Sequence, residues 1–131
     1  MSFVKTYRDL DKYQNAIELA MKVFELTKTF PTEERFVLTD QIRRSSRSVC
    51  TNIAEAWRKR RYRAAFVAKL SDSESEGAET QVSMELALRC RYCSREVFEQ
   101  VDAGYETVLA QLVRTADHAD QWLIKPRRES E

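Results

Sequence analysis

Residues 38–63 read LTDQIRRSSRSVCTNIAEAWRKRRYR, and this stretch predicts how the rest of the chain folds. On a helix with about 100° per residue, its apolar and small residues fall on one face. They are Leu38, Ile42, Ser46, Val49, Ile53, Ala56 and Trp57. Arg43, Arg47, Arg58 and Arg61 gather on another face, within an arc of roughly 60°. The stretch therefore predicts one long helix with a core face and a cationic face.

Length and composition favour one helical domain. The chain has 131 residues, 43% of them hydrophobic, with only two glycines and two prolines, too few for a turn-rich β architecture. It contains no run of about 18 apolar residues and no signal-like leader, so we expect neither a membrane span nor export. Three cysteines, an odd number, are typical of reduced thiols in a cytoplasmic protein.

Apolar periodicity predicts three further helices beside the one at 38–61. The first covers about 9–29 and ends before Pro31; the last covers about 95–124 and carries regular heptads. The third covers about 63–91, although its middle, SDSESEG, would alone suggest a linker, because the apolar phase resumes in register after it. We therefore predict an all-α, antiparallel, up-down-up-down four-helix bundle as a single domain over 1–125, with a disordered tail at 126–131.

The first helix is more apolar than a single bundle requires. Its hydrophobic residues span an arc of roughly 220°, about twice the 100° stripe of a surface helix. We expect the excess to meet another subunit of a homo-oligomer. The candidates for this intersubunit face are Ala16, Leu19, Val23 and Leu26.

Charge is strongly segregated along the chain. Residues 38–63 hold eight basic and two acidic residues, whereas 71–88 hold five acidic residues and no basic one. The basic side chains could bind the phosphates of RNA or single-stranded DNA, with two aromatic residues as stacking faces. These candidates are Arg43, Arg44, Arg47, Arg58, Lys59, Arg60, Arg61, Arg63, Trp57 and Tyr62. Alternatively, the arginines pair with acids such as Glu74 or Glu76 of the same or a neighbouring subunit, as charge runs on solvated helices often do.

No catalytic or metal-binding pattern emerges from the sequence. Cys90 and Cys93 form a CxxC, but a closed zinc site needs four ligands, and only Cys50 and His118 are left to complete it. One histidine cannot supply the paired Glu-x-x-His motifs of a di-metal bundle, and no Gly-x-Ser-x-Gly or glycine-rich phosphate loop occurs. We expect no enzymatic activity, no cofactor, no metal and no small-molecule substrate.

Four stretches carry a resemblance to a known family. They are YRDLDKYQNAIELA (7–20), FPTEERFVLTDQIRRSSRSV (30–49), TNIAEAW (51–57) and FVAKLSDSESEGAETQ (66–81). In this order they resemble the bacterial four-helix bundle proteins encoded in intervening sequences of 23S ribosomal RNA genes. The chain departs from the family pattern at Tyr13, Cys50, Ala56 and Arg91, where the family often has Trp, Pro, Gly and Gly.

The resemblance carries expectations about assembly and function. It implies a closed homo-oligomer, a ring of five subunits, with no established enzymatic activity. A more distant similarity, to the accessory variability proteins of diversity-generating retroelements, implies a basic bundle that binds nucleic acid and a reverse transcriptase. Together with the residues, this predicts a non-enzymatic interaction or scaffold module, or alternatively a nucleic-acid-binding accessory protein that uses the basic face of the second helix.

Overall fold

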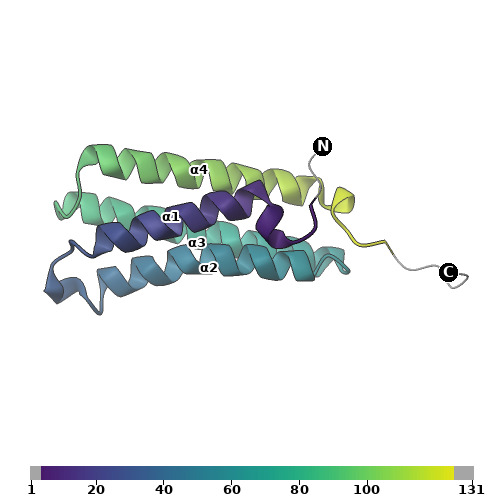
Figure 1. The fold of residues 1–131 in the computed structure, drawn as a ribbon, viewed down its shortest axis with the longest axis horizontal. Coiled ribbons are helices and arrows are strands. Elements are labelled where there is room, and N and C mark those ends of the chain that lie inside the picture. Colours follow the sequence, from purple (N-terminus) through teal and green to yellow (C-terminus); the bar gives the residue numbers. More distant parts are fainter. Residues whose placement is uncertain (1–3, 126–131) are drawn as a thin grey trace, which may run out of the picture.

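The computed structural model describes residues 4–125, which form four long helices and three short 3-10 turns (Figure 1). The helices are α1 (Asp11–Thr27), α2 (Leu38–Arg58), α3 (Arg63–Arg89) and α4 (Arg95–Asp117), and the 3-10 turns are η1 (Tyr7–Asp9), η2 (Thr32–Glu34) and η3 (Ala119–Gln121). Consecutive helices run side by side in alternate directions, as Figure 1 shows. This confirms the predicted all-α four-helix bundle. The predicted disordered tail at 126–131 lies outside the described residues.

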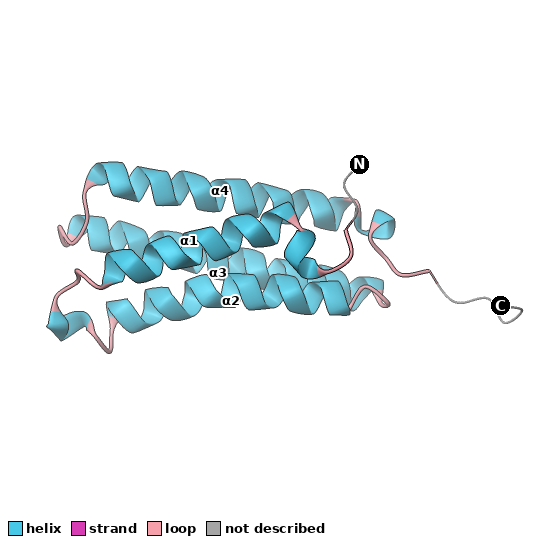
Figure 2. Ribbon diagram, viewed as in Figure 1, coloured by secondary structure: helices cyan, strands magenta, loops and turns pink. Residues whose placement is uncertain are grey.

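The order of the helices around the bundle follows the chain (Figure 2). The closely packed pairs are α1 with α2, α2 with α3, α3 with α4, and α4 with α1. The helices α1 and α3 therefore occupy opposite corners, and their outer surfaces face away from each other. None of the helices described in 4–125 combines the length and apolar character that crossing a bilayer demands.

The core lies where the apolar stripes of the four helices meet. The seven residues predicted for the core face of α2 are all buried, with Ile42 and Val49 fully so. On α4, alternate heptad positions such as Val101, Tyr105 and Val108 are buried in the same cluster. Burial of such side chains contributes about 1.5–3 kcal/mol each.

The third helix is continuous through SDSESEG, as its apolar phase predicts. Ser73 is fully buried, and its hydroxyl donates to the backbone carbonyl of Val49 on α2 at 2.8 Å. A Cβ added to Gly77 would lie 2.7 Å from Cδ2 of Leu109 on α4, so α4 approaches α3 closely at this glycine. The small residues therefore mark helix crossings, not a linker.

All four helices end earlier than predicted, α1 and α3 by two residues and α2 and α4 by more. The second ends at Arg58 and not at 61, because residues 59–62 form a turn in which the Tyr62 N–H donates to the Lys59 carbonyl. The fourth ends at Asp117 and not at 124, because His118 leaves the helical region and a 3-10 turn follows. Neither end carries a glycine or proline that the sequence pattern could have detected.

The predicted intersubunit face on α1 is wrong for three of its four residues. Ala16, Leu19 and Val23 are 0%, 7% and 0% exposed, within the chain's own core. A side chain already enclosed by α2 and α4 cannot contact another subunit. Leu26 is half-buried and packs on the chain's own apolar clusters. The apolar surface of α1 that is left exposed lies elsewhere on the helix.

Candidate interaction surfaces

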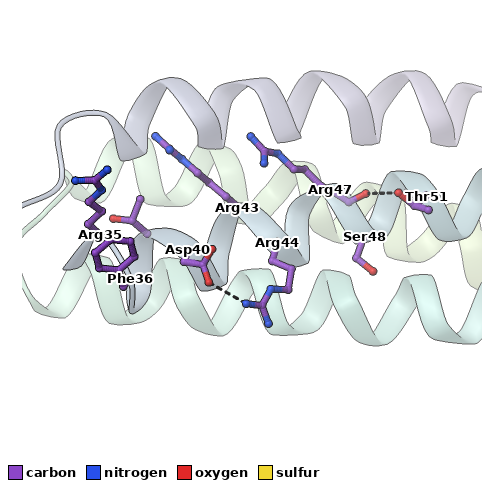
Figure 3. A pocket seen from close by; sticks show the side chains of 9 residues that line it. Arg35, Phe36, Asp40, Arg43, Arg44, Arg47, Ser48 and Thr51 are labelled. Carbon is purple, nitrogen blue, oxygen red and sulfur yellow. Dashed lines mark hydrogen bonds and ion pairs between the residues drawn. The ribbon is translucent and has the colours of Figure 1, made fainter. Parts of the chain in front are cut away.

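Four arginines gather in a shallow groove along the first half of α2 (Figure 3). The groove has a volume of about 580 Å³. Its lining, called here the arginine groove, comprises Arg35, Phe36, Thr39, Asp40, Arg43, Arg44, Arg47, Ser48 and Thr51. Figure 3 shows Arg43 and Arg47 extending to one side of α2 and Arg44 to the other. The arginines in the first half of α2 therefore do not share one face of the helix.

The arginines of this groove differ in how firmly they are held. The Nε of Arg43 donates to Thr27 Oγ1 at 2.7 Å, and its guanidinium lies 4.7 Å from the centroid of the Phe24 ring on α1. Arg44 pairs with Asp40 one turn earlier at 2.8 Å, but both side chains are largely exposed, so this pair is worth little. Arg47 is exposed, and no carboxylate of residues 4–125 lies within 4.0 Å of it. Among the groove arginines on α2, Arg47 is therefore the most available to a partner.

The other basic residues occupy the turn between α2 and α3, at the opposite end of α2. Arg58, Lys59 and Arg61 are exposed there, next to Tyr62, which is 66% exposed. Arg63 forms an exposed ion pair with Asp120 at 3.0 Å. Because α2 ends at Arg58, Arg61 does not continue the helical face predicted for it. The basic residues predicted to form a single cationic face thus form two separate groups, one in the arginine groove and one at the turn between α2 and α3.

Two predicted nucleic-acid contacts are structural instead. Trp57 is only 8% exposed, so the prediction that its ring offers a stacking face is wrong. The guanidinium of Arg60 lies 3.4 Å from the centroid of that ring and donates to the backbone carbonyls of Trp57 and Trp122. Burial lowers the pKa of Arg60. Arg60 therefore holds the segment after α4 against α2 and is not free for phosphate.

The ion pair between α2 and α3 has the opposite polarity to the predicted one, with the cation on α3 and the carboxylate on α2. No ion pair within 4–125 joins the arginines of α2 to Glu74 or Glu76. The α2–α3 contact is made instead by Lys69, whose Nζ lies 2.9 Å from a Glu55 carboxylate oxygen and donates to Asn52 Oδ1 at 3.4 Å. The hydrogen bond to Glu55 raises the pKa of Lys69. Pairing of the arginines with α3 of the same chain is therefore not present in this structure.

An apolar stripe lies on the outer side of α1, although the spacing of three and four between Tyr13, Ile17 and Phe24 predicts a core seam for these residues. Ile17 and Met21 are 36% and 54% exposed, and half-buried Tyr13 and Phe24 extend the stripe along the helix. These four residues, called here the α1 stripe, line one wall of a groove of about 560 Å³ between α1 and α2. The other wall includes Arg47, so this groove adjoins the arginine groove. The broad apolar arc of α1 indicates that some apolar surface of this helix stays outside the core. The arc alone does not tell which of its two sides the core covers.

The CxxC lies at the turn between α3 and α4. Cys90 is exposed and Cys93 half-buried, and both are free thiols. Between them, Arg91 has φ of 65°, a conformation that favours glycine. Across residues 4–125, no three His, Cys, Asp or Glu side chains come together in a way that could hold a metal ion.

The chain is similar to known proteins in both sequence and structure. Residues 8–114 match the model of the 23S rRNA-intervening sequence protein family. A similar solved structure is described as a protein with unknown function from the S23 ribosomal protein family from Bacteroides thetaiotaomicron VPI-5482. It is 30% identical, with a TM-score of 0.73, and the match covers 80% of this chain and 97% of that one. No curated protein matches the chain.

Proposed function

Because the chain belongs to the 23S rRNA-intervening sequence protein family, we propose that it acts as a non-enzymatic, homo-oligomeric interaction module. In this assembly, the groove between α1 and α2 of one copy receives the outer surface of α3 of the next copy. Contacts between two different surfaces are heterologous, and they close into a ring when the rotation between neighbours permits it. The ring of five that the family resemblance implies is one such assembly.

The observation that carries the proposal is the exposure of the α1 stripe. Ile17 and Met21 lie one turn apart on the same helix, and both are large apolar side chains in contact with solvent. Contiguous exposed apolar surface next to polar residues is typical of protein–protein contact sites. The adjoining groove, with a volume of about 560 Å³, has room for side chains of a partner helix.

The outer surface of α3 has the complementary character. Val82 and Leu86 are 60% and 47% exposed and, like Ile17 and Met21, lie one turn apart. Exposed Glu79 accompanies them on α3, where Glu85 pairs with Arg89, whereas Arg47 borders the α1–α2 groove without a carboxylate partner in 4–125. Opposite charges beside matched apolar residues favour one partner and one register.

The experiment is light scattering on purified protein, with paired variants of α1. Wild type should have a mass several times the 15.4 kDa of one chain, and five times for the expected ring. Replacing both Ile17 and Met21 with Gln should give a folded monomer. The matched control replaces exposed Glu18 and Lys22 with Gln, at the same spacing on the same helix, and should leave the mass unchanged. A monomeric wild type at micromolar concentration would refute the proposal.

A second candidate function is the binding of single-stranded RNA or DNA along the arginine groove. The specific observation that favours it is Phe36, which is 81% exposed at the end of the groove with the Arg35 guanidinium 5.1 Å from its ring centroid. A basic groove with an exposed aromatic ring is the usual arrangement for binding a single strand without sequence preference.

A filter-binding titration at two salt concentrations tests this second function. Affinity should fall with a log-log slope of about −0.7 per phosphate contact, and changing Arg47 to Gln should reduce that slope by roughly one contact. Changing Phe36 to Ala should weaken binding without altering the slope, because stacking releases no counterions. No retention of RNA at low salt would remove this candidate.

A further inference from the structure

A large pocket lies away from both the α1 stripe and the arginine groove. It is at the end of the bundle where α1 begins and where α2 and α4 end, near both ends of the described chain (Figure 1). Its volume is about 1070 Å³, which is sufficient for a small organic molecule. This end pocket is lined by Leu10, Lys12, Trp57, Arg60, Arg114 and Trp122, among others.

A buried lysine distinguishes the end pocket from an ordinary surface depression. Lys12 is only 7% exposed, and its ammonium lies 4.5 Å from the centroid of the Trp122 ring. Across residues 4–125, no carboxylate lies within 4.0 Å of this ammonium, and no oxygen accepts a hydrogen bond from it. A buried ammonium with three unused donors is costly unless an anion compensates it. Burial accordingly lowers the pKa of Lys12.

The start of α1 adds further free donors at the same place. The helix begins after Leu10, whose side chain has no oxygen to cap it. The first backbone N–H groups of a helix have no partner within the helix and attract negative charge. Lys12 lies within this first turn, so its ammonium and the helix start act on the same region.

The acids near the pocket do not neutralise it. The Asp9 carboxylate accepts the backbone N–H groups of Lys5 and Thr6 at 2.9 and 3.0 Å, so it is engaged by the N-terminal arm. The other acid, Asp11, raises the pKa of Lys12, but less than burial lowers it. Arg60 and Arg114 add two more positive charges to the lining. Asp9 and Asp11 also line the pocket, so its wall carries three cationic side chains against two carboxylates.

We propose that the end pocket binds a small organic anion, whose carboxylate or phosphate oxygens accept hydrogen bonds from the Lys12 ammonium. The apolar part of the ligand would contact the lining around Trp57 and Trp122. This site is separate from the proposed assembly surface, because no residue lines both the end pocket and the groove beside the α1 stripe.

The tryptophans provide a direct readout, because the chain has only two and both line the end pocket. Titration of the full chain with benzoate and phenyl phosphate, at constant ionic strength, should change tryptophan fluorescence saturably. Benzyl alcohol, which has the ring but no charge, should bind with an affinity at least about tenfold lower than that of the anions. The tighter of the two anions identifies carboxylate or phosphate as the preferred group.

Variants of Lys12 separate binding from packing. Lys12→Met keeps the length of the side chain and should weaken anion binding by about tenfold or more, while Lys12→Arg should retain it. Lys22→Met, at an exposed position on the same helix, should change nothing. Without ligand, Lys12→Met should unfold at the same or a higher temperature than wild type, because it removes a buried unpaired charge. The monomeric Ile17 and Met21 variant should bind as wild type does.

Two results would overturn this proposal. One is a fluorescence response to the anions no stronger than the response to benzyl alcohol, up to about 10 mM. The other is an anion affinity of the Lys12→Met variant equal to that of wild type, which would mean that Lys12 serves only to pack against Trp122.

Discussion

The two glycines of the chain, Gly77 and Gly104, both lie inside helices, where each costs about 1 kcal/mol relative to alanine. Packing is the structural reason for keeping them, and the two sites differ in how much room they leave. A Cβ at Gly104 would lie 2.5, 3.2 and 3.3 Å from three atoms of the Leu19 side chain. A Cβ at Gly77 would press on one atom, Cδ2 of Leu109 at 2.7 Å, with the next contact at 3.6 Å.

These contacts predict different outcomes for the two alanine substitutions. Leu19 is 7% exposed and cannot move aside easily, so Gly104→Ala should cost about 1–3 kcal/mol of overpacking against about 1 kcal/mol of helix propensity gained. Leu109 is half-buried and can shift its side chain toward solvent, so Gly77→Ala should be close to neutral. We expect Gly104→Ala to be the less stable variant, by up to about 2 kcal/mol.

The assay is urea or thermal unfolding of wild type and both variants at one protein concentration, because assembly makes the melting temperature concentration-dependent. For a chain of this size, this difference in stability corresponds to a gap of up to about 8 °C in Tm. Leu19→Val in the Gly104→Ala background should recover part of the loss, as a double-mutant cycle would register. A Gly104→Ala variant about 1 kcal/mol more stable than wild type would refute the packing argument.

Other predictions follow from single residues. Arg91→Gly should stabilise the chain by about 0.5–1 kcal/mol in urea unfolding, because Arg91 has φ of 65° and glycine adopts this conformation without strain. Tyr105→Phe should be neutral or stabilising by about 1 kcal/mol, because the buried Tyr105 hydroxyl has no hydrogen-bond partner among the described residues; a loss above about 2 kcal/mol would show that it has one. Iodoacetamide at about pH 8 should modify exposed Cys90 first, Cys93 more slowly, and buried Cys50 only after unfolding, as peptide mass spectrometry would reveal. Burial raises the pKa of Cys50 from 9.0 to about 11, so the contribution of the buried thiol to stability is complete below pH 9 and should be lost as pH rises to about 11. A difference in unfolding free energy between wild type and Cys50→Ala that is the same below pH 9 and at about pH 11 would contradict this.

Periodicity predicted the interior of the bundle better than its surface. The core face of α2 and the continuity of α3 across Ser73 and Gly77 were both correct, because a repeated spacing reports which residues must share a buried face. The same spacing could not assign the two edges of the broad apolar arc on α1. Residues on one half of the arc, such as Leu19 and Val23, became core, and those on the other half, such as Met21, remained on the surface.

The candidate site was predictable in composition but not in geometry. Counting charges identified the arginines of α2, yet only the structure reveals that Arg43 is held by Thr27 and that Arg60 covers Trp57. Both contacts join residues from separate segments, which local spacing does not report. Arg35 and Phe36 were overlooked because they precede α2, in a connection without periodicity.

The central claim is that the chain assembles through two different surfaces, α1 with α2 on one copy and α3 on the next. A mixing experiment tests it most directly, using the Ile17→Gln, Met21→Gln variant and a second variant with Val82→Gln and Leu86→Gln. Each should be a monomer alone in light scattering, because each lacks one of the two surfaces. Mixed in equal amounts, at the highest concentration at which each alone is monomeric, they should form a dimer and nothing larger, since one intact pair of surfaces remains. A mixture that stays monomeric, or a Val82 and Leu86 variant that assembles as wild type does, would contradict the account.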